Sequence, residues 1–127
     1  MNFKTLLTAG ILAFAATAFA ADGHSHDAKP EHGGVVTEAS DIEFELVAKA
    51  DRVTIYVRDH GKPVSTRGTT GKLTMLSGAQ KTEAALTPAG DNKLEGNGSF
   101  SVAPGTKFVA AVTLQGKQPV NVRFAMK

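Results

Sequence analysis

Apolar and polar residues alternate along most of the chain after residue 34. The segments Ile42–Val47 and Val53–Arg58 each carry apolar side chains at every second position, and the short polar stretch Lys49–Asp51 lies between them. Successive side chains of a strand point to opposite faces, so each segment would bury one face. The pattern predicts a β-hairpin in this part of the chain.

A second hairpin is predicted near the C-terminus, where Phe108–Leu114 and Val120–Met126 alternate on either side of the turn Gln115–Pro119. Weaker strand patterns, separated by glycine and proline, lie between the hairpins at Leu73–Leu76, Thr82–Leu86, Leu94 and Ser99–Val102. About seven short strands without a helical period favour an all-β fold. We predict a single small antiparallel β-sandwich or barrel-like domain over residues 34–127, and the pattern leaves sandwich and barrel both open.

Residues 1–20 have the pattern of a secretory signal peptide. Lys4 gives a positive start, Leu6–Phe19 is mainly apolar, and Ala18-Phe19-Ala20 is a cleavage site of the A-x-A type. A membrane-spanning helix needs about 20 apolar residues, and this run is shorter and stops before Asp22. We therefore expect export, cleavage of the signal and no membrane insertion of the mature chain.

Composition narrows the possible functions. The formal net charge is +2, or +1 after removal of Lys4, and the charges are interspersed without a run of five. Nothing in this distribution indicates binding to nucleic acid or to an anionic membrane. The chain has no cysteine, so disulfides and thiolate metal ligands are excluded.

Residues 21–33 are polar and lack a hydrophobic period, which predicts a flexible, histidine-containing arm. His24, His26 and His32 fall in this stretch, and the chain has four histidines altogether. Imidazole is the usual ligand of Cu(II), Zn(II), Ni(II) and Co(II), so the arm is a candidate metal site. A solvated polar tail behind a signal peptide is the alternative.

The cleavage bond affects this candidate. Cleavage after Ala20 is expected, because Ala18 and Ala20 are both small. Cleavage one residue later would make Asp22-Gly23-His24 the new N-terminus. Its free amine, backbone nitrogens and imidazole would then form a square-planar site suited to Cu(II) or Ni(II).

The fourth histidine, His60, follows the second strand of the first predicted hairpin. A turn of two or three residues after Ala48 would place His60 opposite Ala39 or Ser40, where the chain enters from His32. His32 and His60 could then share a metal ion with oxygen donors from the nearby acids Glu31, Asp41 and Asp59. An entry turn at His32 and a surface loop at His60 are the alternatives.

No catalytic constellation is visible. The sequence lacks a G-x-S-x-G nucleophile elbow and a phosphate-binding glycine loop before a helix. Glu43 and Glu45 are paired carboxylates, but alternation assigns both to the solvent face of a strand. We therefore do not expect an enzyme.

Three segments carry a family resemblance: Glu31–Val36 with its "HGG" turn, Phe44–Val47, and Ile55–Val64 with its "YVRDHGKP" stretch. They resemble small periplasmic proteins of heavy-metal resistance systems. They are also similar to a β-rich segment in the periplasmic adaptor subunits of heavy-metal efflux pumps of the resistance-nodulation-division type. The resemblance implies metal handling in the periplasm, with His32 and His60 on motif positions and an efflux component as partner. The chain has no room for the helical hairpin and lipoyl-like domain of an adaptor, so we expect a stand-alone domain.

Together these observations predict a periplasmic protein that captures or buffers a copper-, zinc-, nickel- or cobalt-type ion in heavy-metal resistance. The candidate ligands are the four histidines and two nearby acids, namely His24, His26, His32, His60, Asp59 and Glu31. The alternative is a metal-independent, adaptor-like interaction domain that docks a partner through sheet edges or loops.

Overall fold

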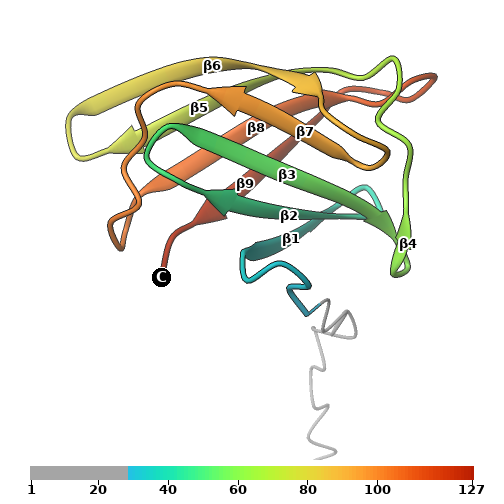
Figure 1. Ribbon diagram of the computed structural model, residues 1–127, viewed down its shortest axis with the longest axis horizontal. Helices are drawn as coiled ribbons and strands as arrows, with labels where there is room; N and C mark the ends of the chain where they lie inside the picture. Colours follow the sequence, from blue (N-terminus) through green and yellow to red (C-terminus); the bar gives the residue numbers. More distant parts are fainter. Residues whose placement is uncertain (1–28) are drawn as a thin grey trace, which may run out of the picture.

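A computed structural model describes residues 29–127 of the protein, and this part of the chain is all-β, as predicted (Figure 1). The nine strands are β1 (Val35–Ala39), β2 (Ile42–Ala48), β3 (Arg52–Asp59), β4 (Lys62–Pro63), β5 (Thr70–Ser77), β6 (Gln80–Pro88), β7 (Lys93–Asn97), β8 (Lys107–Thr113) and β9 (Val120–Ala125). Within residues 29–127 there is no helix long and apolar enough to cross a membrane.

The strands form one antiparallel sheet in the order β1-β2-β3-β7-β6-β5-β8-β9, with β4 paired to β3. The two ends of this order lie side by side, and the Thr37 hydroxyl of β1 donates to the Arg123 carbonyl of β9 at 2.8 Å. No backbone ladder joins β1 to β9 in the described part of the chain. The sheet is therefore a barrel that is nearly closed, and this narrows the two predicted architectures to the barrel-like one.

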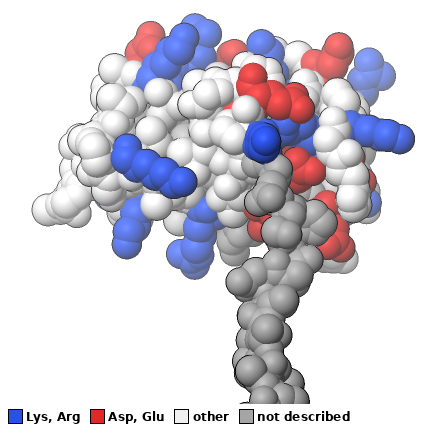
Figure 2. Space-filling view, turned by 90° about the horizontal axis from the view of Figure 1, so that it is seen from below, with Lys and Arg blue, Asp and Glu red and all other residues white. Residues whose placement is uncertain are grey.

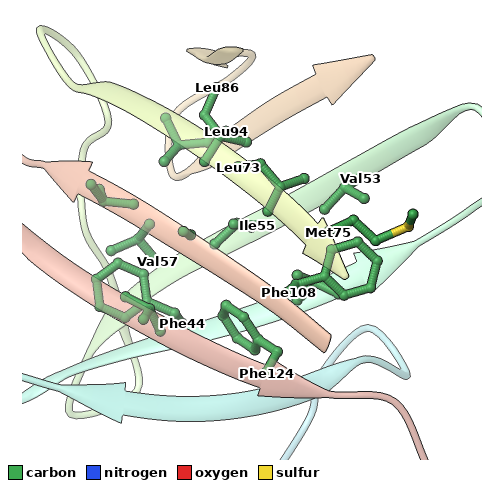
Figure 3. Packing of buried hydrophobic residues seen from close by; sticks show 14 of the residues in the cluster. Phe44, Val53, Ile55, Val57, Leu73, Met75, Leu86, Leu94, Phe108 and Phe124 are labelled. Carbon is green, nitrogen blue, oxygen red and sulfur yellow. The ribbon is translucent and has the colours of Figure 1, made fainter. Parts of the chain in front are cut away.

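The inward faces of the strands fill the barrel with apolar side chains (Figure 3). The completely buried ones are Phe44, Leu46, Val53, Ile55, Val57, Leu73, Met75, Leu94, Phe108, Ala110, Val112 and Val122. Burying a large apolar side chain contributes roughly 1.5–3 kcal/mol, so this lining is the main source of stability in a chain without disulfides.

Two tight turns bring charged residues to one end of the barrel. Ser40 and Asp41 connect β1 to β2 with φ of 51° and 64°, and His60 and Gly61 connect β3 to β4 with φ of 50° and 80°. Two successive residues with positive φ make the two-residue turn whose twist matches that of the flanking strands. Asp41 and His60 thereby lie in the loops at the same end of the sheet.

The register of the first hairpin differs from the predicted one. Ala48 pairs with Val53, because the Lys49 N–H donates to the Arg52 carbonyl at 2.8 Å and closes a longer turn than expected. The prediction that His60 lies opposite Ala39 or Ser40 is therefore wrong. Continued along the strands, the observed register brings His60 level with Asp41.

Candidate functional site

The first cluster of polar residues surrounds Glu45 of β2, whose side chain is completely buried. Its strand position faces outward, but the segment Glu31–Gly34 folds back over it. The backbone N–H groups of Glu31, His32 and Gly34 donate to its carboxylate at 2.9, 2.8 and 3.0 Å. The prediction that Glu45 is exposed to solvent is wrong for this reason.

His32 is held by the same carboxylate and by an aromatic ring. Its Nδ1 donates to Glu45 Oε1 at 3.2 Å, and its ring stacks on Tyr56 of β3 with centroids 3.6 Å apart and planes 1° from parallel. Tyr56 is the cross-strand partner of Glu45, so both contacts come from one point of the sheet. Because Nδ1 of His32 is hydrogen-bonded to Glu45, Nε2 is the ring atom that could bind a metal ion.

Arg58 of β3 balances the buried charge, and its own side chain is only 4% exposed. Its guanidinium lies 2.7 Å from Glu31, 3.6 Å from Glu45 and 3.9 Å from Glu43, and it donates to the Lys29 carbonyl at 3.3 Å. A buried carboxylate is tolerated when it is paired and hydrogen-bonded, as it is here. We call residues 29–34 with the side chains of Glu45, Tyr56 and Arg58 the N-terminal clasp.

The two glycines of the "HGG" turn have different roles in the clasp. Gly33 has a φ of +74°, a conformation that other residues adopt at a cost. A Cβ on Gly34 would come within 2.9 Å of the Leu46 carbonyl carbon and closer still to its oxygen. The turn therefore needs glycine at Gly33 for the backbone angle and at Gly34 for the close approach to β2.

The clasp sets the protonation of Glu45. Burial by itself raises the pKa of this carboxyl, but the backbone N–H groups of Gly34, Glu31 and His32 stabilise the charged form more strongly. The pKa therefore lies below its ordinary value of 4.5, and the carboxylate is ionised at neutral pH.

The second cluster is the exposed pair Asp59–His60 at the turn after β3. His60 Nδ1 lies 2.5 Å from Asp59 Oδ1, and this hydrogen bond, with the charge of Asp59, raises the pKa of His60 above 6.5. The side chains are 74% and 52% exposed. The turn is anchored by Glu43, whose Oε1 accepts the Gly61 N–H at 3.1 Å.

A pocket of about 510 Å³ opens beside this turn. The turn between β3 and β4 lies at the right-hand end of the barrel in Figure 1. Phe44 and Leu114 lie in its apolar wall, and Asp41, Asp59 and His60 lie on its rim. Apolar walls with a few polar groups are typical of ligand pockets. This pocket could not be predicted from the sequence, because Leu114 and the loop after it join its lining only through the closure of the barrel.

The structure thus distributes the predicted ligands between two places. Glu31 and His32 belong to the clasp, Asp59 and His60 belong to the pocket rim, and His24 and His26 lie outside the described residues. Within residues 29–127, no group of three or more histidine or acidic side chains could hold a metal ion by itself.

The clasp and the rim are nevertheless neighbours through Glu43. Its Oε1 accepts from the rim turn, and its Oε2 lies 3.9 Å from the Arg58 guanidinium of the clasp. Acidic and basic side chains accordingly lie side by side where the described chain begins (Figure 2).

Comparisons with protein-family models, curated proteins and solved structures find no match to this chain. The resemblance to heavy-metal resistance proteins therefore stays a prediction that depends on the quoted motifs.

Proposed function

We propose that the protein binds a transition metal ion of the copper, zinc, nickel or cobalt type. The histidines of the arm, His24 and His26, and the Asp59–His60 pair of the pocket rim are the proposed ligands. In this proposal Glu31 and His32 position the arm through the clasp. The proposed setting is the periplasm, where the domain would capture or buffer the ion in heavy-metal resistance and pass it to an efflux component.

The observation that carries the proposal is the carboxylate partner of each described histidine. His60 Nδ1 contacts Asp59, and His32 Nδ1 donates to Glu45. A carboxylate on Nδ1 favours the tautomer with its lone pair on Nε2, and metal-binding histidines have this kind of support in most proteins. The exposed position of Asp59–His60 makes it the better placed of the two pairs to take up an ion from solution.

The clasp explains how the arm would complete the ligand set. His26 comes three residues before Lys29, and an extended chain spans at most about 3.5 Å per residue, so His26 is tethered within roughly 11 Å of Lys29. The Lys29 carbonyl accepts a hydrogen bond from Arg58, and the Arg58 guanidinium lies beside Glu43. Glu43 in turn anchors the His60 turn by accepting the Gly61 N–H. The arm is therefore tied to the molecule close to the Asp59–His60 pair.

The proposal is tested by calorimetric titration of the mature protein with Cu(II), Zn(II), Ni(II) and Co(II). We expect one ion per chain, and we expect His24→Ala/His26→Ala and His60→Ala each to weaken binding about tenfold or more. Asp59→Asn should also weaken binding about tenfold or more, because it removes both the carboxylate that supports His60 and the charged oxygen that the pair offers to the ion. The ion competes with a proton on His60, so affinity should rise as the pH rises through the raised pKa of His60.

Lys62→Ala is the matched control, because it shortens an exposed side chain beside the same turn and removes no metal ligand. It should leave the affinity unchanged. Binding no tighter than millimolar for all four ions, or equal binding by the histidine variants and the unmodified protein, would overturn the proposal.

A further inference from the structure

Among the described residues, strand β6 has one edge that carries no backbone ladder over most of its length, and Gly96 of β7 approaches it only at Ala84–Leu86. Its first edge pairs with β5 along the whole of Gln80–Leu86. Its second edge pairs with β7 only at Thr87 and Pro88 within the described part of the chain. An uncovered edge presents backbone donors and acceptors that can pair with another strand.

The register shows which backbone groups face this open edge. Ser77 and Gln80 flank the two-residue turn of the β5–β6 hairpin, so Gln80 is hydrogen-bonded to β5, and so is every second residue after it. The N–H and C=O groups of Lys81 and Glu83 therefore point away from β5. The far end of β6 follows the same alternation, because the Ala89 N–H donates to the Lys93 carbonyl, away from β5, at 3.0 Å.

The side chains on this edge carry opposite charges two residues apart. Lys81 and Glu83 are both exposed, and they lie 3.3 Å apart on the same face of the strand. If two copies of β6 pair antiparallel around Thr82, Lys81 of each copy lies opposite Glu83 of the other. Residues that both point to the open edge then face one another, so each such pair exchanges two backbone hydrogen bonds.

We propose that β6 is a self-complementary edge through which two copies of this chain associate as a symmetric dimer. The partner is a second copy because the edge matches itself in both backbone pattern and charge. A shift of the register by two residues would place Lys81 opposite Lys81, or Glu83 opposite Glu83, and like charges directly opposite are unfavourable. The charges therefore select one register.

The dimer should be weak. The open part of β6 is short, and the two charge pairs are exposed, so each contributes little. Glu83 also contacts Lys72 at 2.9 Å within its own chain, and this contact competes with the second copy. Association should consequently appear at micromolar to millimolar concentration and weaken as salt is added.

The test is sedimentation velocity of the mature protein across this concentration range, with a chelator present to exclude dimers bridged by metal. Lys81→Glu and Glu83→Lys should each be monomeric, because each places like charges opposite one another. An equimolar mixture of the two variants should form a heterodimer, since the two edges then carry opposite charges. Thermal unfolding of each variant confirms that it is folded.

The matched control is a mixture of Lys107→Glu with Glu83→Lys. It has the same net charges as the first mixture, but Lys107 lies on β8, away from the β6 edge. In this mixture Glu83→Lys should stay monomeric and form no stable heterodimer, while Lys107→Glu, whose β6 edge is unchanged, should self-associate as the unmodified protein does. The proposal is overturned if the Lys81→Glu and Glu83→Lys mixture stays monomeric at millimolar concentration, or if both single variants associate as strongly as the unmodified protein.

Discussion

The carboxylate of Glu45 makes most of the interactions that hold residues 29–34 against the barrel. It accepts hydrogen bonds from three backbone N–H groups and from the His32 ring Nδ1, and it lies beside the Arg58 guanidinium. Because this carboxylate is buried, a change that leaves its donors unpaired has a large effect on the free energy of unfolding. At the scale of single residues, Glu45 determines where the chain enters the domain.

Replacing Glu45 with glutamine should lower the free energy of unfolding by about 1–3 kcal/mol at pH 7, because the amide nitrogen would face backbone donors. The folded pKa of Glu45 is depressed, so its stabilisation is fully present above 4.5 and is lost as the pH falls through the folded pKa. Urea unfolding of Glu45→Gln and of the unmodified protein, measured from neutral to acidic pH, checks both points. The difference between the two proteins should shrink at low pH.

Glu95→Gln is the control for this measurement, since Glu95 is on β7 and its nearest ion-pair distance, to Arg52, is 3.9 Å. It should change stability by less than about 1 kcal/mol. Equal stability of Glu45→Gln and the unmodified protein at neutral pH would show that the buried carboxylate does not stabilise the clasp.

At this scale, the sequence predicts where the histidines lie in the fold but not all of their side-chain contacts. The "HGG" spacing indicated a tight turn at Gly33-Gly34, and Asp59-His60 was correctly expected at the end of a strand. The burial of Glu45 could not be predicted, because alternation assigns a side to each residue but does not reveal a segment that folds back over that side. For the same reason, the stack of His32 on Tyr56 was missed.

At the scale of elements, the alternation of apolar and polar residues predicts the strands, but it does not predict the registers in which they pair. Both predicted hairpins are present as β2–β3 and β8–β9. The predicted pairing of Ala48 failed because polar turn residues do not reveal how many of them a turn contains. The segment Glu31–Gly34 folds back onto β2 because of two glycines, Gly33 and Gly34. The effect of replacing each glycine can be measured separately.

Gly34→Ala should destabilise the protein by about 1–3 kcal/mol and detach the clasp, because the new Cβ would overlap the Leu46 carbonyl. Gly33→Ala should cost about 1–2 kcal/mol through its backbone angle, with the clasp still attached, since a Cβ there meets nothing within 4 Å. Tyr56 is the single tyrosine in a chain without tryptophan, so its fluorescence reports the His32 stack.

Urea unfolding gives the stability of the two glycine variants, and Tyr56 fluorescence gives the state of the clasp. A large change in fluorescence is expected for Gly34→Ala and a small one for Gly33→Ala. The opposite order would contradict the roles given to the two glycines.

At the scale of the whole molecule, the chain builds two groups of strands that meet through β7. Strands β1–β4 come from one continuous stretch, and strands β5, β6, β8 and β9 form the rest of the sheet. Strand β7 pairs with both β3 and β6 and joins the two groups. Local patterns could not predict this order, because pairing between distant strands leaves no periodic signal in either one.

The β3–β7 junction has a consequence for how fast the protein folds. Val53 pairs with Gly96, so this contact closes a long loop, and loop closure opposes folding until the contact has formed. Proteins dominated by such contacts refold in milliseconds to seconds. Stopped-flow refolding gives, for each variant, the share of its total destabilisation that appears as slower folding. This share should be larger for Leu94→Ala on β7 than for Val122→Ala on β9. Equal shares would mean that the rate does not depend on joining the two groups of strands at β7.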